Sequence, residues 1–112
     1  MPMTDSKGKV FEEEYKELAR KLIYIIENAK FTRERKGGYN AEQVDEFLDS
    51  LMLEIDKHSR HQNIANLIKT TNIVDVLFDK EKSGYNMGEL DDFLDLLEME
   101  VEKLNVVKLR YM

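Results

Sequence analysis

The stretch KSGYNMGELDDFLDLL, at 82–97, nearly repeats KGGYNAEQVDEFLDSL, at 36–51 of the same chain. In each copy a Gly-Tyr-Asn triplet is followed by apolar residues that recur at steps of four and three. This spacing predicts that an amphipathic helix begins just after each triplet. The apolar residues before each triplet also match, so we predict two repeats of one helix-loop-helix unit, over residues 26–57 and 73–104.

The two predicted helices present the same apolar stripe. Its eight residues are Val44, Leu48, Leu51 and Ile55 in the first copy, and Leu90, Leu94, Leu97 and Val101 in the second. Matching stripes on two helices favour parallel packing, as in a two-stranded coiled coil. The intervening segment, 58–78, is long enough to return the chain to the start of the second helix, even as a helix itself. We therefore expect the two stripes to form a packing seam in a coiled-coil-like pair.

Each of these helices also begins with a recognisable signal. Asn40 and Asn86 stand at the N-cap position, where a side-chain oxygen accepts a hydrogen bond from a free amide of the first turn. Gln43 and Glu89, three residues later, are the expected partners of a capping box. A glycine two residues before each asparagine favours a sharp turn of the chain.

A further helix is predicted before the first copy. Between residues 10 and 30, apolar residues from Phe11 to Ala29 recur at steps of three and four and form a broad face. The chain has 112 residues, one proline and 36% charged residues, a profile typical of helices with solvated charged faces. We predict a single all-α domain over residues 1–112, made of two helix-loop-helix repeats.

The net charge and the composition argue against several classes of partner and site. The net charge of −6 argues against nucleic acid as a partner, because phosphate binding needs a basic surface. The absence of cysteine excludes disulfides and thiolate metal sites and is consistent with a reducing compartment. Without a signal-like apolar segment or a run of about eighteen apolar residues, the sequence predicts a cytoplasmic protein.

The repeated pattern resembles the amino-terminal domain of the DivIVA family, which includes the GpsB adaptors. The pattern is an apolar residue, a phenylalanine five positions later, Gly-Tyr-Asn, then Gln-Val-Asp or Glu-Leu-Asp, and Phe-Leu-Asp. It is carried by Ile26, Phe31, 38–40, 43–45 and 47–49, and again by Ile73, Phe78, 84–86, 89–91 and 93–95. The resemblance covers well over half of the chain.

This resemblance implies a function. Family members are parallel coiled-coil dimers that act as scaffolds in cell division and polar growth, and GpsB-like members bind arginine-bearing tails of penicillin-binding proteins through a tyrosine and two aspartates. The corresponding residues here are Tyr39, Asp45 and Asp49 in the first copy, and Tyr85, Asp91 and Asp95 in the second. The resemblance therefore implies a non-enzymatic cytoplasmic adaptor at the division septum or cell pole, with division or cell-wall proteins as partners.

The residue types agree with this expectation. Asp45 and Asp49 are four positions apart and hence neighbours on one helix face, and Tyr39 precedes the first turn. Two carboxylates beside an aromatic ring suit a planar guanidinium, which donates charge-assisted hydrogen bonds from its edge while its face meets the ring. The same acid pair is also compatible with an ordinary solvated helix face.

Two alternative functions stay open. The first is a self-associating structural module that binds no peptide. The second is peripheral membrane binding through the basic loop that contains Arg33, Arg35 and Lys36. That loop has no bulky apolar residue to insert, so we expect at most weak, salt-sensitive attraction to anionic lipid.

Metal binding and catalysis have little support. The stretch DKEKSGYNMGEL resembles a calcium loop in part, but Leu90 occupies the position where a bidentate glutamate is required. His58 and His61 are three positions apart without an evident third ligand. No phosphate-binding loop, zinc-protease motif or nucleophile elbow occurs, so we expect no cofactor, no metal and no enzymatic activity.

Overall fold

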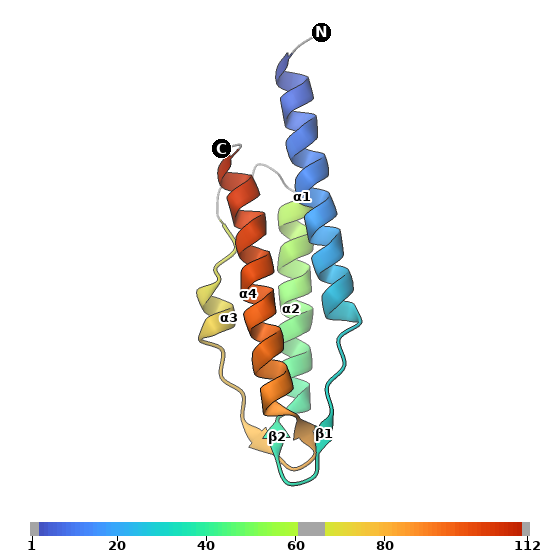
Figure 1. Cartoon of the computed structure of the whole chain (residues 1–112), viewed down its shortest axis with the longest axis vertical. Coiled ribbons are helices and arrows are strands. Elements are labelled where there is room, and N and C mark those ends of the chain that lie inside the picture. Colours follow the sequence, from blue (N-terminus) through green and yellow to red (C-terminus); the bar gives the residue numbers. More distant parts are fainter. Residues whose placement is uncertain (1–2, 61–66, 111–112) are drawn as a thin grey trace.

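The structure is a computed structural model that describes residues 3–60 and 67–110, with side chains described from residue 13 onward. In this part the elements are α1 (Met3–Glu27), β1 (Arg33–Glu34), β2 (Gly38–Tyr39), α2 (Ala41–Arg60), α3 (Thr71–Val74), β3 (Lys80–Glu81), β4 (Gly84–Tyr85) and α4 (Met87–Arg110). The three long helices run along the long axis, and the strands lie together at one end (Figure 1).

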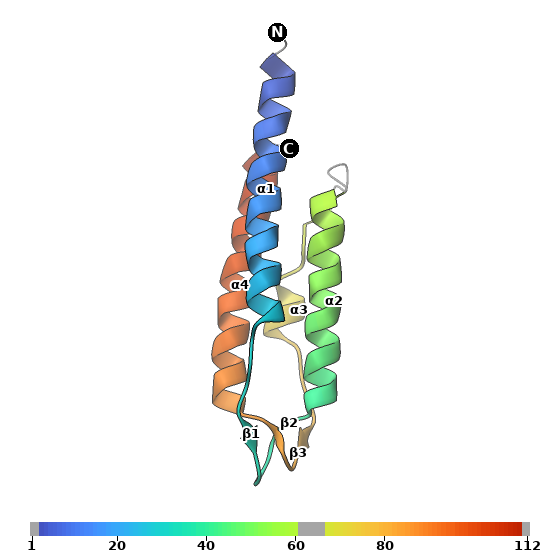
Figure 2. The same cartoon turned by 90° about the vertical axis from the view of Figure 1, so that its right-hand side faces the viewer.

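The helices share one hydrophobic core. α1 packs against both α2 and α4, and α3 packs against α4. In Figure 2, α1 lies in front of α4, α2 lies to the right, and α3 is seen behind them, between α1 and α2. Seven of the eight stripe residues are buried and Leu94 is half-buried, and they join four buried residues of α1: Tyr15, Ala19, Leu22 and Ile26. The predicted apolar faces of α1, α2 and α4 are therefore the faces that form the core.

The predicted fold class is confirmed only in part. The fold is mostly helical, but it is not all-α, because the four short strands form an antiparallel sheet in the order β1-β4-β2-β3. The coiled-coil-like pairing of α2 and α4 is not confirmed. The main helix contacts of both are with α1, so a helix from outside the pair takes up contacts that the prediction assigned to the opposite stripe.

The sheet pairs strands of the first repeat with strands of the second. β1 of the first repeat pairs with β4 of the second, and β2 of the first pairs with both strands of the second. At its centre Tyr39 lies opposite Tyr85, and the neighbouring Gly38 and Gly84 are buried. A Cβ atom added to either glycine would lie 2.6 Å from the carbonyl carbon of the other. The glycines are required by this close backbone approach; neither has a positive φ.

The predicted N-caps are confirmed. The amide of Gln43 donates to Asn40 Oδ1 at 2.9 Å, and the amide of Glu89 donates to Asn86 Oδ1 at 2.8 Å. Each cap therefore satisfies a first-turn amide that has no partner within its helix.

The predicted capping boxes are wrong in their second half. The Gln43 side chain accepts from the amide of Asp79 at 2.8 Å and donates to its carboxylate at 2.9 Å. The Glu89 carboxylate accepts from the amide and hydroxyl of Thr32, at 2.8 and 2.9 Å. Both side chains thus turn away from their own N-cap and bind the loop of the other repeat.

Buried polar groups fix the end of the molecule opposite the sheet. The Asn105 side chain donates to the carbonyl of Ile68 at 2.8 Å and accepts from its amide at 3.1 Å. Residues 67–70, which the sequence allowed to be helical, are therefore held in a non-helical form against α4. His58 Nδ1 and Lys108 Nζ lie 3.2 Å apart, and both residues are buried.

The glycine crossing can be tested with two alanine variants. Gly38→Ala forces a methyl group into the backbone of the other repeat, and we expect it to lower the free energy of unfolding by about 1–3 kcal/mol or more. Gly88→Ala is the control, because a Cβ there meets only Asn86 Oδ1 at 3.4 Å. Within helix α4 this change is expected to be neutral or stabilising by up to about 1 kcal/mol. Urea unfolding measures both, and equal stability of the two variants would contradict the crossing.

The buried His58 predicts a pH dependence of stability. Burial and then the nearby Lys108 and Lys57 ammonium groups lower the pKa of His58 below its usual 6.5. In the unfolded chain His58 therefore binds a proton at a pH at which it stays neutral in the folded chain. The free energy of unfolding consequently falls as the pH drops below about 6.5. His58→Gln should remove this part of the dependence. Urea unfolding between pH 5 and 8 measures it, and an unchanged slope in the variant would contradict the assignment.

Candidate functional site

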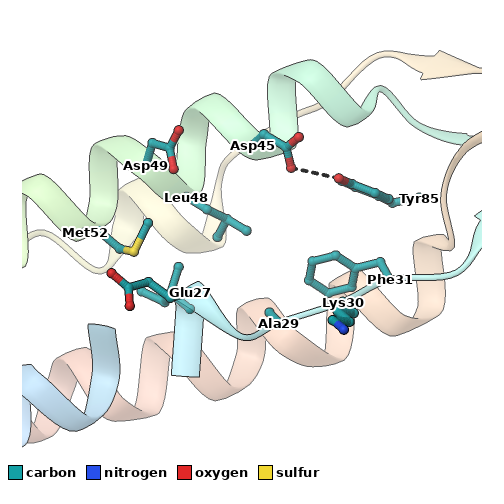
Figure 3. Close-up of a pocket in the computed structure, with 10 residues that line it drawn as sticks. Glu27, Ala29, Lys30, Phe31, Asp45, Leu48, Asp49, Met52 and Tyr85 are labelled. Carbon is teal, nitrogen blue, oxygen red and sulfur yellow. Dashed lines mark hydrogen bonds between the residues drawn. The ribbon is translucent and has the colours of Figure 1, made fainter. Parts of the chain in front are cut away.

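A cleft of about 680 Å³ lies where α1 ends beside α2, close to the sheet (Figure 3). It is lined by Ile26, Glu27, Ala29, Lys30 and Phe31 from the end of α1 and the loop after it, by Asp45, Leu48, Asp49 and Met52 from α2, and by Tyr85 from β4. The cleft thus has carboxylates on two walls, Glu27 on one and the two aspartates on the other. Ile26 and Leu48, which belong to the core, add apolar groups to this lining.

The tyrosine in this cleft comes from the second repeat. The Tyr85 hydroxyl donates to Asp45 Oδ1 at 2.9 Å, and the Tyr39 hydroxyl donates to Asp91 Oδ1 at the same distance. The predicted grouping of each tyrosine with the aspartates of its own copy is therefore wrong. The crossing of β2 and β4 carries each tyrosine over to the helix of the other repeat.

Aromatic contacts hold this exchange in place. The ring of Phe31 lies 5.3 Å from that of Tyr85 and 5.4 Å from that of Phe93, both in the second repeat. Phe78 makes the corresponding contacts with Tyr39, at 5.7 Å, and with a phenylalanine of α2, at 5.8 Å. Tilted and edge-on rings at these distances attract one another beyond the effect of burial. Each tyrosine is therefore packed as well as hydrogen-bonded.

Arg33, predicted as a lipid contact, is engaged within the molecule. Its guanidinium carbon lies 4.8 Å from the centre of the Tyr85 ring, and it donates to the carbonyl of Ser83 at 2.7 Å. A cation over an aromatic face and a charged hydrogen bond both orient the tyrosine. Arg35 and Lys36, the other two predicted lipid contacts, are exposed on the same loop.

The cleft is acidic and its tyrosine is neutral at physiological pH. Glu27, Asp45 and Asp49 are all exposed, with Lys30 as the cation in the lining. Burial, followed by the hydrogen bond to Asp45, raises the pKa of Tyr85, and Arg33 opposes this only in part. The cleft therefore offers negative charge, a hydroxyl and an aromatic ring, which suits a cationic group of the ligand.

Glu27 was missed by the sequence interpretation. It directly follows the motif residue Ile26, at the last position of α1, and this adjacency was the available signal. Asp91 and Asp95, predicted as the second site, lie exposed on successive turns of α4. The structure thus brings Asp45, Asp49 and Tyr85 into one cleft.

Other kinds of site have no structural support in the part of the chain that is described. Within residues 3–60 and 67–110, no group of three or more histidines, cysteines or acidic residues is arranged to hold a metal ion. His61, considered as a ligand with His58, lies outside those residues. No helix among them is both long and apolar enough to cross a lipid bilayer.

Comparison with protein-family models, with curated proteins and with solved structures finds no match for this chain.

The crossed tyrosine pairs can be tested by double-mutant cycles. We expect Tyr85→Phe and Asp45→Ala to be coupled by about 0.5–1.5 kcal/mol in the free energy of unfolding, because they share a hydrogen bond. Tyr39→Phe with Asp45→Ala is the matched control, and its changes should be additive. Urea unfolding of the single and double variants measures both cycles. Coupling in the control cycle alone would restore the grouping predicted from sequence.

Proposed function

We propose that this protein is a non-enzymatic cytoplasmic adaptor that binds an arginine-bearing segment of another protein in the cleft between α1 and α2. The observation that carries the proposal is the arrangement of Glu27, Asp45 and Asp49 around one cleft that also contains Tyr85. Carboxylates and an aromatic ring at one place match the edges and the face of a guanidinium.

Asp45 and Asp49 have different parts in this proposal. Asp45 already accepts the Tyr85 hydroxyl with one oxygen, so its orientation is fixed before a ligand arrives. Asp49 projects over the same cleft one turn further along α2 and is exposed. A guanidinium with five N–H donors can bond several carboxylate oxygens at once, whereas an ammonium lacks the matching plane. The proposed site therefore prefers arginine to lysine.

The affinity of such a site depends on more than one ion pair. A solvent-exposed ion pair contributes only about 0–1 kcal/mol, less than even millimolar binding requires. A bound segment must therefore also use the apolar groups of the cleft, such as Met52. We expect weak binding of free arginine and stronger binding of a peptide with apolar residues next to the arginine.

The resemblance to the DivIVA family supports the choice of partner. The motif residues that correspond to the arginine-binding residues of GpsB-like adaptors include Tyr85, Asp45 and Asp49, which meet in the cleft. The proposed partners are accordingly division or cell-wall proteins, such as the cytoplasmic tails of penicillin-binding proteins. The proposed location is the cytoplasm at the division septum or the cell pole.

The two alternative functions have less support. Self-association through the helix stripes would require residues that are mostly buried within the single chain. Lipid attraction by the first loop would have to rely on Arg35 and Lys36, because Arg33 is bonded to the second repeat. We therefore keep the adaptor as the proposed function.

Peptide binding tests the proposal. Asp49→Asn should weaken binding of a labelled peptide containing one arginine by about two- to fivefold, since it removes one charged contact of the guanidinium. Glu46→Gln removes an equal charge from an exposed position of α2 outside the cleft lining and should leave binding unchanged. Fluorescence anisotropy measures both, with a peptide carrying lysine in place of arginine as a second control. Equal weakening by the two variants would reduce the effect to net charge and contradict the site.

A further inference from the structure

The duplication creates a second position that corresponds to the cleft. Tyr85, Asp45 and Asp49 correspond to Tyr39, Asp91 and Asp95, while Glu27, Lys30 and Met52 correspond to Val74, Leu77 and Glu98. The tyrosine and the aspartates are thus kept, and the surrounding residues differ. These differences decide whether the second position can bind the same ligand.

The first difference is the distribution of acid. In the cleft, Glu27 at the end of α1 and the two aspartates of α2 lie on opposite walls. At the second position Val74 replaces this glutamate, and the acidic residues that correspond to Asp45, Asp49 and Met52, namely Asp91, Asp95 and Glu98, belong to α4. A guanidinium donates from more than one edge, so carboxylates on two walls bind it better than a row on one helix.

The second difference is the length of the helix that precedes α2 or α4 in each repeat. α1 has 25 residues and runs beside α2, and hollows lined by Ile23, Leu53 and Asp56 continue from the cleft along these two helices. α3 has only four residues, and the described residues before it, 67–70, are not helical. The helix that precedes α4 within its repeat, α3, thus has one turn, whereas α1, the helix that precedes α2, is long. Flanking residues of a bound segment can use these hollows beside the first site.

The third difference is the support of the tyrosine. Arg33 lies opposite Tyr85 in the β1–β4 pair and places its guanidinium over that ring. Lys80 lies opposite Tyr39 in the β2–β3 pair, and it is exposed. An ammonium lacks the plane with which a guanidinium stacks on a ring and bonds a carbonyl at the same time. Tyr85 is therefore the more firmly oriented of the two tyrosines.

From these differences we infer that one chain has one binding site for an arginine-bearing segment, and that this site is the cleft between α1 and α2 with its continuation past Ile23 and Leu53. The inference rests on the proposed function and deepens it. Because exposed ion pairs contribute little, the flanking groove decides the affinity, and hollows of this kind adjoin the first position along α1 and α2. The partner segment is then an arginine followed or preceded by apolar residues, bound at a ratio of one to one.

Isothermal titration with a synthetic peptide tests this inference. The probe contains a single arginine with leucines three and four residues away, and the full chain is titrated. We expect one peptide per chain. Asp49→Asn should weaken binding about two- to fivefold, and Asp95→Asn, the corresponding change at the second position, should alter the dissociation constant by less than twofold.

Two surface leucines test the groove separately from the charges. Leu53 is 72% exposed and Leu77 is 92% exposed, so neither change to serine threatens the core. Leu53→Ser should weaken binding of the peptide severalfold, and Leu77→Ser should leave its dissociation constant unchanged. Two equivalent sites per chain, or equal weakening by Asp49→Asn and Asp95→Asn, would overturn the inference while leaving the proposed function standing. Failure of the unmodified chain to bind any arginine peptide would instead overturn the proposed function and the inference with it.

Discussion

The constraint on which the structure depends is the contact of two backbones at Gly38 and Gly84. Because neither residue has a side chain, the β2 and β4 strands approach closely enough for Tyr39 and Tyr85 to lie opposite each other. Each loop is then directed to the helix of the other repeat, where Gln43 and Glu89 bind it. The exchange of tyrosines, aromatic rings and loop hydrogen bonds follows from this one crossing.

The sequence predicts what local forces determine. Apolar periodicity marks the buried faces of α1, α2 and α4, and an asparagine oxygen reaches only the next few amides, so the N-caps at Asn40 and Asn86 could be read directly. The sheet could not be predicted in this way, because strands of two residues are too short to show a periodic pattern. The crossed pairs, such as Tyr85 with Asp45, depend on contacts between residues far apart in sequence.

The two repeats are similar in sequence, but their first helices differ in length. α2 and α4 carry the same apolar stripe, but before them stand a helix of 25 residues in one repeat and a helix of four in the other. α1 contacts both α2 and α4, and its buried residues share one core with the two stripes. At the opposite end, the buried side chain of Asn105 binds the backbone of Ile68, because buried polar groups must be paired, and so fixes the non-helical return of the chain.

The charges of the cleft show why a cationic ligand suits it. Glu27, Asp45 and Asp49 lie around one opening, and like charges brought together by folding repel one another. The nearby Arg33 does not line this opening; it is bonded to Ser83 and stacked on the Tyr85 ring instead. The basic first loop thus orients the tyrosine and leaves the cleft acidic. A guanidinium between the two walls would bring the opposite charge to these carboxylates, which a neutral or anionic ligand would not.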